Sequence, residues 1–133
     1  MERIMVDTSA IYALLDGSDS MHGQAVLFFN ELSKKQVTIV VTNFMVAECH
    51  ALLANRLGSE IARAWLEGLC WPIERVTEED ENRAREIIAT YADKSFTYCD
   101  AAAFAVMERL EINRALAFDQ HFIQYGFTLY NPA

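Results

Sequence analysis

Short apolar runs alternate along the chain with longer segments in which apolar residues recur every three or four positions. The runs that have the length and composition of buried strands are residues 4–6, 37–41, 73–76, 115–118 and 127–130. The segments between these runs predict amphipathic helices. Since strands alternate with helices, the sequence predicts an α/β, three-layer fold with a mostly parallel central sheet of four to five strands and helices on both faces.

Capping residues indicate where the predicted helices begin and end. Ser9 is a plausible N-cap for a helix over 10–15, and Thr42 for the helix that Gly58 ends. Thr77 and Thr97 each have an Asp three residues later, which is the spacing of a capping box.

Length and charge narrow the class of protein. A chain of 133 residues is most simply one domain, residues 1–133. Its formal net charge of −8 argues against a protein that coats nucleic acid through bulk electrostatics. No apolar run approaches the length of a membrane span, and the first residues lack the pattern of a signal peptide. Three widely spaced cysteines suggest neither a disulfide framework nor a thiolate zinc site, so we expect a cytoplasmic protein.

Asp7 lies where the first predicted strand passes into a helix. In open α/β sheets ligands bind outside the carboxyl ends of the strands, so this carboxylate is a candidate for a functional site. The alternative is that Asp7 only caps the helix or forms an Asx-turn, and Asp7 alone does not decide between them.

Glu48 lies in the predicted helix over 43–57, on an apolar stripe with Phe44 and Leu52. No Lys or Arg stands three or four residues away from it. A buried carboxylate must be paired, protonated or bound to a metal, which makes Glu48 a candidate ligand. The alternative is that Glu48 sits at the edge of the stripe and reaches water.

Asp100 and Asp119 complete the set of candidate acids. Asp100 heads a stripe of apolar residues that we expect to face the core, so its carboxylate should point towards the sheet. Its alternative role is structural, in the capping box that Thr97 begins. Asp119 directly follows the fourth predicted strand, as Asp7 follows the first.

In a parallel sheet with right-handed crossovers, the strand-to-helix turns gather at one edge. Four carboxylates from separate parts of the chain can therefore converge on one pocket, where their mutual repulsion requires compensation. Oxygen ligands without a histidine or cysteine partner favour Mg²⁺ or Mn²⁺ over Zn²⁺. The reaction that such a site suits is attack of water on a phosphodiester, assisted by one or two metal ions.

The segments IMVDTSAIYALL, FMVAECHALL, SFTYCDAAAFAVM and ALAFDQHF resemble, in their order and spacing, the four acidic motifs of the PIN-domain family. The spacing is similar to that of VapC-type ribonuclease toxins of bacterial toxin–antitoxin pairs. The resemblance implies a PIN fold, a Mg²⁺- or Mn²⁺-dependent endoribonuclease acting on RNA, usually a homodimer, and an antitoxin protein as a possible partner. By motif position, the metal-binding and catalytic acids would be Asp7, Glu48, Asp100 and Asp119.

Further expectations rest on the same resemblance. Thr8, Ser9 and Thr97 match hydroxyl residues close to the metal site, where they would bind substrate or support the acids. Some relatives carry an additional acid where this chain has Gln120 and His121. The two-tryptophan region and its neighbouring helices would form the groove for an antitoxin tail. The cations that could steer an RNA backbone, or simply be solvated surface charge, are Arg56, Lys94, Lys34 and Lys35.

Two other functions are compatible with acids at strand ends. One is a catalytically silent PIN fold that serves as an RNA- or protein-binding scaffold, which the presence of all four acids disfavours. The other is a phosphoryl-transfer protein such as a receiver domain. Asp7 is followed by Thr and Ser, without the paired acids that aspartyl-phosphate phosphatases use, and Asp119 stands where a receiver would have a Lys.

Overall fold

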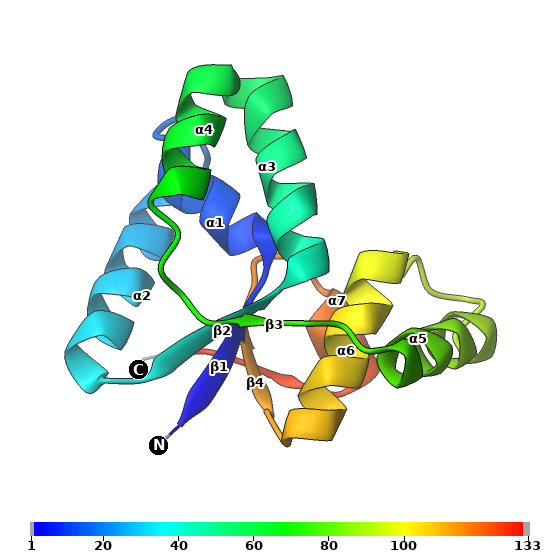
Figure 1. Cartoon of the computed structure of the whole chain (residues 1–133). Coiled ribbons are helices and arrows are strands. Elements are labelled where there is room, and N and C mark those ends of the chain that lie inside the picture. The colour runs from blue at the N-terminus through cyan, green and yellow to red at the C-terminus, as the bar shows by residue number, and fades with distance from the viewer. Residues whose placement is uncertain (1, 132–133) are drawn as a thin grey trace.

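The computed structural model describes residues 2–131, so the two ends of the predicted domain, residues 1 and 132–133, lie outside the described part. Helices and strands alternate as predicted (Figure 1). In chain order the elements are β1 (Arg3–Val6), α1 (Thr8–Leu15), α2 (His22–Lys35), β2 (Thr38–Thr42), α3 (Asn43–Leu57), α4 (Ser59–Glu67), β3 (Ile73–Glu74), α5 (Glu78–Thr90), α6 (Tyr98–Leu110), β4 (Arg114–Leu116), α7 (His121–Tyr125) and β5 (Thr128–Leu129).

The strands form one parallel sheet in the order β3-β2-β1-β4-β5. The first strand is central, and its residue Met5 pairs with Val40 of β2 on one side and with Ala115 of β4 on the other. Every neighbouring pair in this sheet is parallel, so the carboxyl ends of the strands lie at one edge. The predicted fold class is confirmed.

Alternate residues of β1 belong to two separate cores, one on each face of the sheet. Ile4 and Val6 pack in the core formed with α1, α2 and α4, whereas Met5 packs in the core formed with α5, α6 and α7. All three side chains are fully buried. Figure 1 shows the two groups of helices on opposite sides of the sheet, with α3 rising from its edge between them. Burying each such side chain contributes about 1.5–3 kcal/mol, which fixes β1 at the centre.

The caps agree with the sequence except at the first helix. Thr42, Thr77 and Thr97 cap α3, α5 and α6, the last two with complete capping boxes. The predicted N-cap Ser9 is wrong, because α1 begins two residues earlier than a Ser9 cap allows and Asp7 caps it. Asp7 has extended backbone angles and its side chain accepts a hydrogen bond from the Ser9 amide.

The fourth strand is shorter than predicted, ending at Leu116 rather than Phe118. The neighbouring strand β1 ends at Val6, because Asp7 already caps α1. Ala117 and Phe118 therefore have no residues of β1 beside them to pair with. Asp119 therefore follows β4 after a short irregular segment. Among residues 2–131 no helix is both long and apolar enough to cross a membrane.

Candidate functional site

A hollow of about 430 Å³ lies at the carboxyl edge of the sheet, where Asp7 ends β1. Its size falls in the range of about 300–1,000 Å³ that is usual for small-ligand sites. The wall is formed by Asp7, Thr8, Ser9, Tyr12, Asp19, Ser20, Met21, Glu48, Leu52, Arg56, Thr97, Asp100, Phe118, Asp119 and His121. All four predicted acids and all three predicted hydroxyl residues are therefore at one hollow.

Asp7 is held by the turn that it caps. Its carboxylate is only 4% exposed, and Oδ2 accepts hydrogen bonds from the Ser9 amide at 3.2 Å and from Ser9 Oγ at 2.7 Å. Ser9 Oγ in turn accepts a hydrogen bond from the Phe118 amide at 3.0 Å. This chain of hydrogen bonds joins the end of β1 to the segment that follows β4, so Ser9 sets the orientation of Asp7.

The pKa of Asp7 is raised to about 7. Burial is the main cause, because a desolvated carboxylate is less stable in its charged form. The negative charges of Asp119 and, less strongly, Asp100 add to the effect, while the hydrogen bonds from Ser9 oppose it. The site thus concentrates negative charge that the surrounding protein does not balance.

Asp100 has the orientation that the sequence predicts. It is 6% exposed in the first turn of α6, and its Oδ2 accepts a hydrogen bond from the Thr97 amide at 3.0 Å. Thr97 Oγ1 accepts the reciprocal bond from the Asp100 amide at 3.0 Å. The capping role and the place at the hollow are therefore combined in one side chain, rather than being alternatives.

His121 brings an imidazole to the acids. Its Nδ1 lies 2.7 Å from Asp100 Oδ2 and 3.9 Å from Asp119 Oδ1. The shorter approach is an ion-pair distance without the alignment of a hydrogen bond, since among residues 2–131 this buried nitrogen has no hydrogen-bond partner. Asp119 Oδ1 accepts a hydrogen bond from the His121 amide at 3.1 Å, which fixes the two residues relative to each other.

Glu48 is placed differently from the main expectation. It is exposed, and the side of α3 that enters the core carries Met45, Cys49 and Leu53, one residue further along than the predicted stripe. The expectation of a buried Glu48 is therefore wrong, and the edge position is correct. Glu48 and Leu52 of the predicted stripe nevertheless form part of the wall of the hollow.

The charge of Glu48 also acts on a neighbouring thiol. Burial raises the pKa of Cys99 well above its ordinary value, and the charge of Glu48 is the next largest cause, followed by Asp100 and Asp7. These three acids come from α3, α6 and the end of β1, so the Cys99 thiol lies within the field of three of the four predicted acids. Cys99 is thereby held in its neutral form.

The chemistry of the donor set fits a hard divalent cation. Five carboxylates, those of the four predicted acids and of Asp19, line one hollow, and Thr8 Oγ1 is a buried hydroxyl oxygen that lacks a hydrogen-bond partner within the described chain. In the conformation that residues 2–131 adopt, no three acidic, histidine or cysteine side chains lie close enough together to hold a metal. The expected convergence is thus confirmed for the pocket, whereas a preassembled coordination shell is not present in this conformation.

Part of the wall was not predicted. Tyr12 of α1 lies within the first motif but is not among the predicted site residues. Asp19 to Met21, in the connection to α2, belong to no motif, and only the path of the chain brings them here. The sequence also does not predict the contact of His121 with Asp100, although His121 stands two residues after the candidate acid Asp119. Of the four candidate cations, Arg56 lines the hollow, whereas Lys34, Lys35 and Lys94 do not.

The parallel sheet with acids at its carboxyl edge defines the class of protein. The family model described as PIN domain matches residues 4–128, and the chain belongs to this family. Within the family, the 23S rRNA-specific endonuclease VapC20 of Mycobacterium tuberculosis (strain ATCC 25618 / H37Rv) is 31% identical to this chain over 132 residues, which cover 97% of this chain and 98% of that protein. The predicted resemblance to VapC-type toxins is confirmed.

Solved structures agree with this assignment. The crystal structure of Mycobacterium tuberculosis VapC20, described as a Sarcin-Ricin loop cleaving toxin, matches with a TM-score of 0.83 and 30% identity, covering 94% of this chain and 96% of that one. FitAcB from Neisseria gonorrhoeae matches with a TM-score of 0.69 over 97% of both chains, at 20% identity. The second match shows a common fold.

Proposed function

We propose that this protein is a metal-dependent endoribonuclease, the toxin of a type II toxin–antitoxin pair. The observation that carries the proposal is the gathering of Asp7, Glu48, Asp100 and Asp119 around one hollow. The raised pKa of Asp7 supports it, because a cluster of acids that disfavours its own charge gains most from a bound cation. Membership of the PIN-domain family supports the same chemistry.

Asp7, Asp100 and Asp119 would hold Mg²⁺ or Mn²⁺, directly or through water. When bound, the ion would supply an activated water and neutralise charge on the leaving oxygen. Glu48 has the exposure needed to meet solvent, so we assign to it the orientation of the attacking water or a share in holding the ion. Hydrolysis in line would leave 5′-phosphate and 3′-hydroxyl ends.

The hydroxyl residues have separate tasks in this proposal. Ser9 orients Asp7 through its 2.7 Å hydrogen bond, and Thr97 orients Asp100 through the capping box. The unpaired Thr8 Oγ1 is free to donate to a phosphate oxygen or to a water at the ion. Because the hollow holds about 430 Å³, it accepts a short piece of a single strand or loop rather than a duplex.

The substrate that we would test first is 23S ribosomal RNA. The relative VapC20 carries that specificity in its name, and its similarity extends over 97% of this chain. The alternative of a catalytically silent scaffold gains no support from the site, because none of the four acids is replaced.

The proposed antitoxin would bind near Trp65 and Trp71. An apolar hollow of about 240 Å³ lies between α1 and the segment after α4, with both tryptophans in its wall. Trp71 also stacks on Phe29 of α2, with ring centroids 5.7 Å apart. Similar solved structures include a toxin–antitoxin complex from Klebsiella pneumoniae and DNA-bound VapBC from Salmonella typhimurium, which supports a protein partner. At 12–13% identity these structures show the common fold alone.

We also propose that the protein forms a homodimer. The exposed side chains of Leu66 and Ile73, at 44% and 37%, border a second hollow of about 340 Å³ with Val46 and His50. Apolar surface of this kind favours association. The molar mass of the purified protein in solution tests it directly.

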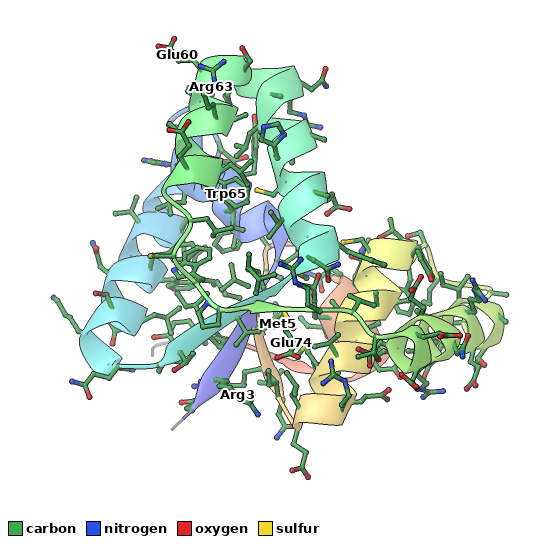
Figure 2. All side chains as sticks on the ribbon, viewed as in Figure 1. Arg3, Met5, Glu60, Arg63, Trp65 and Glu74 are labelled. Carbon is green, nitrogen blue, oxygen red and sulfur yellow. The ribbon has the colours of Figure 1, made fainter. Side chains whose placement is uncertain are left out.

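Glu48→Gln is the sharpest test of the activity. Glu48 is exposed and caps no helix, so this variant should fold like the wild type, whereas Asp7 and Asp100 also carry structural hydrogen bonds. We expect wild-type protein with Mn²⁺ to cut ribosomal RNA and Glu48→Gln to be slower by about 10² or more. Glu60→Gln, in α4, is the matched control and should cut normally (Figure 2). Equal cleavage by the wild type and Glu48→Gln would refute the assignment.

A further inference from the structure

The wall of the catalytic hollow carries one cation of the Lys or Arg type among the described residues, and that cation is Arg56. Five acidic residues share the wall with it: the four proposed catalytic acids and Asp19. RNA entering such a site meets repulsion at every acid that a metal does not neutralise. A single fixed positive charge therefore has a large effect on how the strand lies.

Arg56 is held by an aromatic ring rather than by an acid. Its guanidinium carbon lies 5.3 Å from the centre of the Tyr12 ring, a cation–π distance. The Tyr12 hydroxyl donates a hydrogen bond to Asp16 Oδ2 at 2.5 Å, which fixes the ring. Within the part of the chain that is described, no carboxylate forms an ion pair with Arg56. Apart from its contacts with Tyr12, the guanidinium is therefore open to an anionic ligand.

We propose that Arg56 binds a phosphate of the RNA strand next to the one that is cleaved, and so fixes the position of the strand across the hollow. A guanidinium presents its N–H groups in a plane that matches two phosphate oxygens, and the cation–π contact with Tyr12 limits the movement of the Arg56 side chain. This inference rests on the proposed ribonuclease function. It assigns to the mouth of the hollow a contact with the RNA backbone. Such a contact positions the strand but does not read its sequence.

A purely structural role for Arg56 makes different predictions. Arg56 lies in the last turn of α3, where a positive charge favours the helix dipole. That role would change the thermal stability of the protein but not the dependence of RNA binding on salt. The two roles are therefore separated by measuring both quantities on the same variants.

The experiment uses cleavage kinetics and RNA binding at several salt concentrations. Binding of a labelled single-stranded RNA is followed in a Glu48→Gln background, which prevents its cleavage. We expect Arg56→Gln to raise KM about tenfold with kcat nearly unchanged, and to reduce the slope of log affinity against log salt by about 0.7, the value of one phosphate contact on a single strand. Arg56→Lys should keep the slope.

Arg63 provides the control. It is an exposed arginine of α4, at the outer end of that helix beside Glu60 in Figure 2, and it does not line the hollow. Arg63→Gln should leave both KM and the salt slope unchanged. If the wild type cuts RNA but Arg56→Gln has the wild-type KM and slope, the Arg56 proposal is overturned alone. If the wild type neither binds nor cuts RNA, both proposals fail together.

Discussion

Ser9 Oγ donates a 2.7 Å hydrogen bond to Asp7 Oδ2, and this bond is one of the few interactions that favour the charged form of Asp7. Burial and the neighbouring Asp119 act in the opposite direction. The same hydroxyl accepts a hydrogen bond from the Phe118 amide, so it also ties the end of β1 to the segment that carries Asp119. One small side chain thus controls both the charge and the position of a proposed metal ligand.

Ser9→Ala should therefore shift the pH dependence of activity. Without the hydroxyl the pKa of Asp7 rises further above 7, so the acidic limb of the rate profile moves to higher pH by about half to one unit. Ser9→Thr keeps a hydroxyl and serves as the control. Profiles of kcat/KM measured at a fixed, sub-saturating Mn²⁺ concentration, where proton and metal compete for Asp7, check this, and coinciding acidic limbs for all three proteins would contradict it.

Asp7→Asn should stabilise the metal-free protein at neutral and alkaline pH. The folded pKa of Asp7 is about 7 and its ordinary value is 3.8, so between these values the folded state binds more protons than the unfolded state. Stability then falls as pH rises through this window, and the full penalty is present above pH 7. Asn removes the charge and is itself a good N-cap.

We expect a gain of about 1–4 kcal/mol at pH 8, because one pKa unit corresponds to about 1.4 kcal/mol. The gain should disappear near pH 4, where Asp7 is protonated in the folded protein. Urea denaturation in the presence of a chelator measures both. A variant that is less stable than the wild type at pH 8 would show that Asp7 is not strained by its surroundings.

His121→Ala should weaken metal binding rather than folding. His121 Nδ1 lies 2.7 Å from Asp100 Oδ2, and groups that position a metal ligand typically change affinity by about 10–100-fold when removed. His50→Ala is the control, because His50 lines the separate hollow beside Leu66. Calorimetric titration with Mn²⁺ compares the three proteins. Equal affinities for the wild type and His121→Ala would rule out a positioning role.

Asp80→Asn tests an acid outside the site. Asp80 is 4% exposed, and although burial acts to raise its pKa, hydrogen bonds from Arg109 at 2.9 Å and from Thr77 lower it. A lowered pKa means that this stabilisation is present above the ordinary value of 3.8 and is lost as pH falls through the folded value. At pH 7 we expect a loss of about 1–3 kcal/mol in the free energy of unfolding.

Activity per folded molecule should be unchanged in Asp80→Asn, since Asp80 is not part of the catalytic hollow. Chemical denaturation at pH 7 and pH 3 gives the stability difference, which should shrink at the lower pH. A loss of activity in folded Asp80→Asn protein would indicate that α5 influences the site.

Local patterns were enough to predict most of the framework. Thr42, Thr77 and Thr97 cap helices because their signals lie within three residues, and the alternation of strands and helices fixes a parallel sheet. Glu48 shows where such patterns fail. Two neighbouring stripes of α3 are both largely apolar, and only packing against the rest of the protein selects Met45 and Cys49 for the core.

The features of the site that depend only on sheet topology could be predicted from the sequence. Acids at the ends of parallel strands meet at one edge, so Asp7 and Asp119 could be placed together before the structure was known. The contact of His121 with Asp100 depends on the route of the chain after β4 and on side-chain torsions. No spacing in the sequence encodes either of these.

The dual role of Asp100 affects what its mutants would do in a genetic selection. Because its carboxylate both completes the capping box of α6 and lines the hollow, substitutions there should lower the amount of folded protein together with its activity. Glu48 is exposed and caps no helix, so its substitutions should leave a full amount of folded protein that, under the proposed function, is inactive. A selection for cells that survive expression of the protein should recover mutants at both positions. Folded variants at Glu48 should still bind the proposed antitoxin, whereas poorly folded variants at Asp100 should leave it unbound. Two mutations in the same site would thus have opposite effects on the amount of free antitoxin.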